Sequence, residues 1–328
     1  MLVLPVHLLV VAVAVFFLVR LVPGDPAIAV TGGQASPEQL AAIRQSLGLS
    51  GSIPQQLGAF VSNLVALDLG TSIQTGQPVL EDVFARLPQT LELGVMALVL
   101  ATVLAVGLSG VAVFTPRSPL AAVARGYSRA AGALPDFCLG IVAILVFYVV
   151  LRVAPAPIGR LDARTESPPV LTHLPFLDTL LAGDPVVLRS AAAHLVLPVA
   201  AMTIAYCPYL MKQLILGLER EVDAPSTRFR IAAGASRVMV TVSVFRRAFP
   251  AVVVVTGSLL GGILGGAVVM ESMFGLGGIG QYAVNAVVTS DFPAMQGVLI
   301  VMIAVVLVVF LLVDVVTVLL DPRRKVGA

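Results

Sequence analysis

The chain has 328 residues, 58% of them hydrophobic and only 12% charged, with a net charge of +2. This charged fraction is roughly half of that in soluble proteins, so a soluble core could not hide so much apolar surface. Lipid is therefore expected to solvate much of the chain. The small net charge, and the lack of a basic stripe with interleaved aromatic residues, exclude a nucleic-acid-binding protein.

Several apolar stretches are long enough to cross a membrane, since a helix crosses the ~30 Å hydrocarbon layer in about 20 residues. None alternates polar and apolar side chains with period two, so helices are expected and an outer-membrane barrel is excluded. The predicted spans are Leu2–Val22, Leu91–Phe114, Leu134–Val153, His194–Leu216, Pro250–Met270 and Leu299–Leu320. The fold class is thus an all-α membrane protein with six transmembrane helices.

Two long segments between the spans differ in character. In residues 23–90, Ser36-Pro37-Glu38-Gln39 has the spacing of a capped helix start and Gly48 suits its end, while a second amphipathic pattern runs from Gln55 to Leu67. Short helices on the outer surface are expected there. Residues 154–193 are rich in proline and are predicted to be loop.

Loop charges predict the orientation. The segments after the second and fourth spans and the tail are basic, whereas the other connections carry at least as many acids as bases. Because cytoplasmic loops are enriched in Lys and Arg, both termini are expected inside. The cationic residues assigned to the inner side are Arg117, Arg125, Arg129, Arg220, Arg228, Arg230, Arg237, Arg246, Arg247, Arg323, Arg324 and Lys325.

The expected organisation follows from these assignments. Residues 1–22 form the first transmembrane helix and residues 23–90 an extracytoplasmic segment. Residues 91–320 hold transmembrane helices 2–6, including a cytoplasmic loop at residues 217–249. Residues 321–328 form a cytoplasmic tail.

No motif for catalysis, cofactor binding or metal binding is recognised. Neither lysine, Lys212 or Lys325, stands in a P-loop, so ATP hydrolysis by that route is excluded. Gly275–Gly280 matches the dinucleotide fingerprint but follows a membrane helix instead of a strand, and a tight glycine turn is the better interpretation. Cys138 and Cys207 are expected to be inert thiols in apolar surroundings. The three histidines do not have metal-ligand spacing.

Ionisable residues inside the spans are few. Asp314 is the one acid predicted well within a span, as a helix-packing hydrogen-bond partner or, alternatively, a proton relay. Asp136 is predicted near the end of its span, where a polar side chain can reach the interface. A gradient-driven carrier should contain more intramembrane charge than this.

Two features carry functional hypotheses. Gly257, Gly261 and Gly265 place a glycine groove along one face of the fifth span, for helix packing, for a moving pathway-lining helix, or for both. The loop at residues 217–249 contains arginines and acids, then the small-residue run Ala232–Ala235. By itself this loop is either a solvated connection or a docking surface for a cytoplasmic protein.

Nine short motifs, each occurring once, follow one another along nearly the whole chain. They are Arg20–Pro26, Asp68–Ser72, Leu91–Gly94, Glu271–Phe274, Gly278–Gly280, Asp291–Pro293, Gln296–Gly297, Leu312–Asp314 and Asp321–Arg323. Together these stretches resemble the first permease subunit of dipeptide, oligopeptide and nickel ABC importers. Each motif is weak alone, and their order and spacing make the set specific.

The resemblance implies the type I ABC importer permease fold, half of a translocation pathway working by alternating access in a bacterial cytoplasmic membrane. It implies a second, homologous permease, two cytoplasmic ATPase subunits, an extracytoplasmic solute-binding protein and the lipid bilayer as partners, with no cofactor and no enzymatic activity of its own. The cargo stays open between peptides, a nickel chelate, glutathione and other small solutes. The alternatives are a gradient-driven secondary carrier and a non-transporting membrane scaffold.

The resemblance also implies roles for particular residues. The residues expected to dock the ATPase subunits are Arg228, Arg230, Ala232, Ala233, Gly234 and Ala235. The residues expected to form an outer hairpin are Glu271, Phe274, Gly278 and Gly280. The chain departs from the family pattern where Phe229 and Arg230 replace small residues and Gly277 replaces proline.

Overall fold

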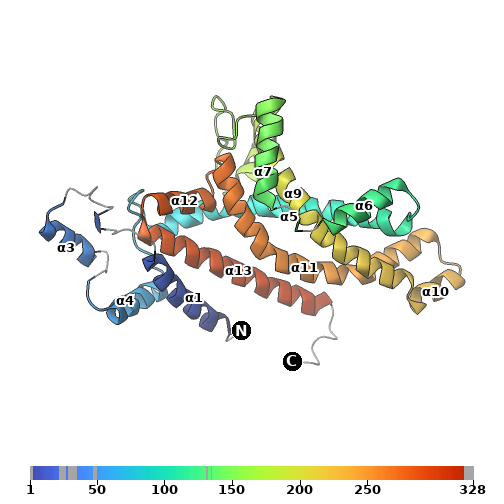
Figure 1. Cartoon of the computed structure of the whole chain (residues 1–328), viewed down its shortest axis with the longest axis horizontal. Coiled ribbons are helices and arrows are strands. Elements are labelled where there is room, and N and C mark those ends of the chain that lie inside the picture. The colour runs from blue at the N-terminus through green and yellow to red at the C-terminus, as the bar shows by residue number, and fades with distance from the viewer. Residues whose placement is uncertain are drawn as a thin grey trace. The chain divides into compact units, whose positions relative to one another are not determined.

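A computed structural model describes residues 3–21, 27–28, 35–46, 50–130, 132–133 and 135–320. These residues are helical or irregular, apart from an isolated antiparallel bridge between Thr71 and Pro78 (Figure 1). The helices are α1 Val3–Arg20, α3 Pro37–Ser46, α4 Ile53–Val65, α5 Val79–Phe114, α6 Pro119–Arg129, α7 Asp136–Ala143, the π-helix η1 Ile144–Val150, α8 Pro175–Ala182, α9 Pro185–Val222, α10 Pro225–Ala232, α11 Arg237–Phe274, α12 Ile279–Val288 and α13 Phe292–Leu320.

The chain forms two compact units. The first comprises residues 1–90 and 277–307, and the second residues 91–276 and 308–328. Helices α5 and α13 each contribute residues to both units. Each unit is described by itself below.

Four helices in the described part of the chain are long and apolar enough to cross a membrane, namely α5, α9, the part of α11 from Val252 to Phe274, and the part of α13 from Phe292 to Val316. Shorter apolar helices cover His7–Arg20 and Asp136–Val150. They fall within the predicted first and third spans. The observed helices extend beyond the predicted spans because hydropathy detects only their apolar parts. Helix α5, for example, begins 12 residues before the predicted start.

The predicted outer-surface helices are confirmed as helices. At the start of α3, the amide of Ser36 donates to Gln39 Oε1 at 2.9 Å and the amide of Gln39 donates to Ser36 Oγ at 3.2 Å. This reciprocal pair is the capping box expected from the sequence. Helix α4 covers most of the second amphipathic pattern. The predicted stop at Gly48, most of the Arg20–Pro26 motif and the tail from residue 321 lie outside the described residues.

The prediction of loop throughout residues 154–193 is wrong, because this segment contains α8 and the first turns of α9. Pro175 and Pro185 stand in the first turns of these two helices, where a missing amide proton costs nothing. Gly183 ends α8 in the left-handed region at φ 70°, and the Asp184 side chain caps α9. The prolines therefore mark helix starts here.

In the first unit, two of the sequence motifs meet although they are 219 residues apart. Ser72 Oγ donates to Asp291 Oδ2 at 2.6 Å, and the amide of Ala294, in the first turn of α13, donates to Asp291 Oδ1 at 3.1 Å. Asp291 is fully buried, and Gly297 lies so close to Val79 that a Cβ there would overlap it. The bridge fixes the Asp68–Ser72 motif to the start of α13.

In the second unit, α9 packs along α11 and α7. Met202, Leu210, Met211 and Leu214 of α9 are fully buried in two apolar clusters that α5 and α11 complete. Helices α6 and α10 lie at the same end of this unit (Figure 1).

Candidate functional site

The predicted docking residues, Arg228, Arg230 and Ala232–Ala235, lie in the short helix α10 and the tight turn that follows it. Ala224 precedes α10, and Gly234 takes the left-handed conformation at φ 80° before Ser236 caps α11 through the amide of Met239. A residue with a Cβ adopts this conformation only with strain. The turn thus presents Ala232, Ala233 and Gly234 at its tip, all of them exposed.

Exposed apolar side chains surround this tip, and sequence reasoning missed them. Phe229 is 74% exposed and Val238 72%. The other exposed apolar residues here are Ile231, Met239 and Val242. Phe229 stood out in the sequence only as a departure from the family pattern. The signal that could have marked it as a contact residue is an aromatic side chain between two arginines, Arg228 and Arg230, in a loop assigned to the cytoplasm.

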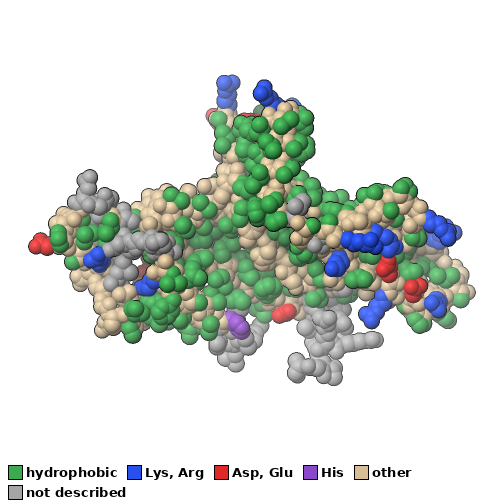
Figure 2. Space-filling view, in the orientation of Figure 1, with side chains coloured by type: hydrophobic (Ala, Val, Ile, Leu, Met, Phe, Trp, Pro, Cys, Tyr) green, Lys and Arg blue, Asp and Glu red, His purple; other side chains and the backbone are tan. Residues whose placement is uncertain are grey.

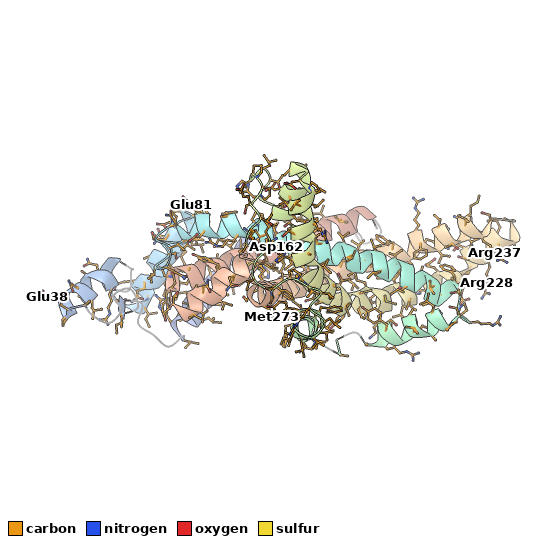
Figure 3. The ribbon with its side chains drawn as sticks, turned by 90° about the horizontal axis from the view of Figure 1, so that it is seen from above. Glu38, Glu81, Asp162, Arg228, Arg237 and Met273 are labelled. Carbon is orange, nitrogen blue, oxygen red and sulfur yellow. The ribbon has the colours of Figure 1, made fainter. Side chains whose placement is uncertain are left out.

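Cationic side chains frame the same end of the unit. Arg228 and Arg230 of α10 and Arg237 of α11 are exposed, and Figure 3 shows Arg228 and Arg237 projecting from this end. Figure 2 shows Lys and Arg side chains gathered over α6 and α10. The segment therefore combines an apolar tip with a positive rim.

A partly buried hydrogen-bond network holds α10 in place. Arg247 of α11 donates from Nε to Glu221 Oε2 and from Nη2 to Thr227 Oγ1, both at 2.6 Å. The Thr227 hydroxyl in turn donates to the backbone carbonyl of Glu221 at 2.7 Å, and Thr227 is 1% exposed. These bonds join the ends of α9, α10 and α11. Helix α10 is therefore tied to two long helices.

Helix α6 is anchored to the same end. Arg125 pairs with Glu219 of α9 at 2.7 Å and also donates to the carbonyl of Ala112 in α5 at 2.9 Å. Arg125 lies in the connection after the second predicted span and Glu219 in the connection after the fourth. These two connections, both predicted to be cytoplasmic from their charge, are therefore in contact.

Towards the other end of this unit, Glu92 caps α8. The amides of Phe176 and Leu177 in the first turn of α8 donate to Glu92 Oε1 at 2.9 and 3.0 Å. A carboxylate at a helix N-terminus satisfies amides that have no partner within the helix and interacts favourably with the helix dipole. The Leu91–Gly94 motif therefore supplies the carboxylate that caps the N-terminus of α8.

Arg160 lies between Glu92 and the end of α11. Its Nη1 contacts Glu92 Oε2 at 3.1 Å, and its Nε donates to the carbonyl of Leu276 at 2.9 Å. Burial lowers the pKa of the Arg160 guanidinium, and the charges of Glu92 and Glu271 offset part of this shift. The group stays protonated because arginine does not lose its proton in proteins.

The predicted outer-hairpin residues fall into both units. In the second unit, Glu271 is completely buried and acts electrostatically on Arg160, while the carbonyl of Phe274 accepts from the amide of Gly159 at 3.1 Å. Gly275 closes the helix at φ 62°. Gly278 and Gly280 belong to the first unit, where the amide of the intervening Ile279 donates to Thr90 Oγ1 at 3.0 Å.

The predicted glycine face of α11 is not uniform. At Gly257 a Cβ would overlap Val313 of α13, so these two helices touch there. At Gly265, which is exposed, a Cβ would meet no atom within 4 Å. Gly257 therefore packs closely inside this chain, whereas Gly265 does not.

No group of three or more His, Cys, Asp or Glu side chains in the described residues is placed to hold a metal ion. His194 instead contacts the carbonyl of Ser190 through Nδ1 at 2.9 Å. The polar networks found here are therefore ones that position helices.

Comparison with known proteins shows which family the chain belongs to. Residues 97–326 match the family described as the binding-protein-dependent transport system inner membrane component, and residues 1–94 match the N-terminal part of such membrane components. The chain belongs to this family of transport permeases. The permease is thus a multi-pass inner membrane subunit of an ABC importer, and ATP hydrolysis resides in separate subunits. This assignment decides against the gradient-driven carrier and the scaffold.

Three relatives illustrate the similarity. The permease is 33% identical to the probable D,D-dipeptide transport system permease protein DdpB of Escherichia coli strain K12, covering 95% of this chain and 92% of the relative. It is 28% identical to the dipeptide transport system permease protein DppB of Alkalihalophilus pseudofirmus, covering 95% and 94%. It is also 28% identical to DppB of Escherichia coli strain K12, covering 94% and 92%.

Proposed function

We propose that this permease forms half of a pathway that imports peptides or similar small solutes. A second, homologous permease would supply the other half, two cytoplasmic ATPase subunits would drive the cycle, and an extracytoplasmic binding protein would deliver the cargo. Peptides are supported as cargo because relatives that match over more than nine-tenths of their length are permeases of dipeptide transport systems, one of them a probable one. The family description supports the binding protein and the ATPase partners.

The proposed membrane topology has six spans with both termini inside. Besides the four long apolar helices, α1 and the continuous pair α7–η1 would cross the bilayer. The placement of the arginine-rich α6 and α10 at one end of the second unit supports a common cytoplasmic side.

The orientation is tested by labelling single cysteines in intact cells, in a background where Cys138 and Cys207 are replaced by serine or alanine. Thr172→Cys is expected to react with a membrane-impermeant maleimide from outside, and Arg237→Cys only after the membrane is opened. Labelling of Arg237→Cys in sealed cells would reverse the assignment.

The observation that carries the docking proposal is the apolar tip around Gly234. A surface with Phe229 and Val238 more than two-thirds exposed is unfavourable in water, because burying such side chains gains roughly 1.5–3 kcal/mol each. The network of Arg247, Glu221 and Thr227 holds the tip rigid, as a force-transmitting element requires. We assign this surface to the ATPase subunits, with Arg228 and Arg230 approaching acidic groups on them.

A charge placed on this surface tests the docking role. Phe229→Asp should strongly reduce the amount of ATPase subunit that copurifies with the permease, since the carboxylate would be desolvated on docking. Leu171→Asp is the matched control, because Leu171 is 61% exposed in the segment assigned to the outer side. If the ATPase subunits copurify with Phe229→Asp at the parental ratio, docking lies elsewhere.

A further inference from the structure

The second unit contains a carboxylate in the middle of the membrane helices that no function above uses. Asp136 begins α7, and the sequence placed it near the membrane interface. In the structure its Oδ2 lies 2.8 Å from the hydroxyl of Tyr206, and that hydroxyl lies 2.9 Å from the carbonyl of Gly262. Tyr206 is midway along the apolar stretch of α9 and Gly262 midway along that of α11. Asp136, the first residue of α7, thus contacts the middle of two long apolar helices.

The missing side chain of Gly266 makes room for this carboxylate. A Cβ at Gly266 would overlap Asp136 Oδ2 and also lie 2.6 Å from the Tyr206 hydroxyl. Three helices thus converge on one polar group: α7 supplies the carboxylate, α9 the hydroxyl, and α11 a notch and a carbonyl. Ordinary helix packing requires neither the charge nor the notch.

Among the described residues, no cationic side chain forms an ion pair with Asp136. Its Oδ1 accepts from the amide of Phe137 at 2.8 Å, which suits a carboxylate in the first turn of a helix. An ionised group within a membrane helix is costly and is kept mainly for function. A bound cationic group would compensate this negative charge.

Open space adjoins the group. Asp136 and Tyr206 are half-buried, Gly262 and Gly265 are exposed, and a Cβ at either glycine would meet no atom within 4 Å. Because Gly265 follows Gly262 by three residues, both lie on one face of α11. A carboxylate and a phenol hydroxyl are poorly suited to a lipid-facing surface, so this face borders either a wet path or another protein chain.

We propose that Asp136 binds the ammonium group of the cargo as it passes through the membrane, with Tyr206 positioning the carboxylate. This inference rests on the proposed import of peptides, every one of which with a free N-terminus carries an α-ammonium whatever its side chains. An ammonium donates up to three hydrogen bonds, and Asp136 retains acceptor positions beyond those used by Tyr206 and Phe137. Such a contact holds the backbone end of a peptide and tolerates many side chains.

Binding is tested without transport in the assembled complex, with Cys138 and Cys207 replaced and Gly265→Cys as a reporter. Dialanine at millimolar concentration should slow alkylation of this cysteine by a water-soluble maleimide, N-acetyl-dialanine should not, and Asp136→Asn should abolish the protection. Equal protection by the two peptides, or protection unchanged in Asp136→Asn, overturns the proposal, as does no protection at all.

Measurements of transport distinguish the loss of the negative charge of Asp136 from a loss of folding. In Asp136→Asn, Oδ1 can still accept from the amide of Phe137, and Nδ2 can donate to the Tyr206 hydroxyl while that hydroxyl donates to the carbonyl of Gly262. The variant should therefore assemble and keep ATPase stimulation by loaded binding protein within about twofold. Its dialanine uptake should fall about tenfold or more, because the neutral amide lacks the negative charge that strengthens the hydrogen bond from the ammonium group. Tyr206→Phe should lose less, Asp136→Glu should recover part of the uptake, and Tyr209→Phe on the same helix should match the parent.

Parental uptake in Asp136→Asn, or joint loss of uptake and ATPase stimulation, overturns the role in binding. A parental complex that shows ammonium-dependent protection but no dialanine uptake would instead contradict the proposed cargo and leave the ammonium site standing.

Discussion

Replacing Ala233 by tryptophan or Gly234 by leucine is expected to abolish coupling of ATP hydrolysis to transport in an assembled complex. Both positions lie exposed at the tip of the turn, so bulk there blocks close approach of an ATPase subunit without disturbing the core. Leucine at Gly234 also has to enter the left-handed region, at a cost of roughly 1–2 kcal/mol. Neutralising Arg228 alone should weaken docking only mildly, since exposed ion pairs contribute under ~1 kcal/mol.

The measurement is uptake and stimulated ATPase activity of reconstituted complexes, with membrane levels checked. Gly76→Leu is the control, because Gly76 also has a positive φ, of 70°, with no atom within 4 Å of an added Cβ, yet lies far from the docking segment in the sequence. The control should lose comparable local stability and retain coupling. Well-expressed Ala233→Trp and Gly234→Leu complexes that transport at the parental rate would exclude this turn as the coupling element.

Replacing Arg160 by methionine is expected to give the largest loss of stability. The change keeps most of the volume of the side chain but leaves Glu92, 7% exposed at its side chain, and the fully buried Glu271 without the guanidinium. Removing one partner of a buried ion pair typically costs ~3–5 kcal/mol. Glu92 also caps α8, so the segment around residues 158–182 should loosen together with the end of α11.

Thermal unfolding of the purified complex and protease sensitivity of this segment measure the effect. Arg164→Met, an exposed arginine in the same segment, is the matched control and should change stability little. Equal unfolding temperatures for Arg160→Met and Arg164→Met would show that the buried charges are compensated by other groups.

Local signals in the sequence were sufficient for some elements. The capping box of α3 needs only Ser36 and Gln39, and the turn at Gly234 needs only a glycine after a short helix. Apolar length located the long helices, although it shortened them, because polar turns at either end of a span carry no hydropathy signal.

Long-range pairings could not be predicted in the same way. Glu92 and Arg160 are 68 residues apart, and nothing in either local sequence indicates that they pair. The contacts of Asp136 with Tyr206 and Gly266 could not be predicted either, because they depend on how α7 packs against α9 and α11. Phe229 was judged against a family pattern, whereas its contribution depends on exposure, which only the fold reveals.

The central claim is that this permease moves solute only as part of an ATP-driven complex. The most direct measurement is uptake of labelled dialanine into proteoliposomes that contain the permease alone or with its partner permease, ATPase subunits and binding protein. We expect uptake only in the full complex, only with ATP on the ATPase side, and unchanged when ionophores dissipate ion gradients. Accumulation by the permease alone, driven by a proton or sodium gradient without ATP, would contradict the account.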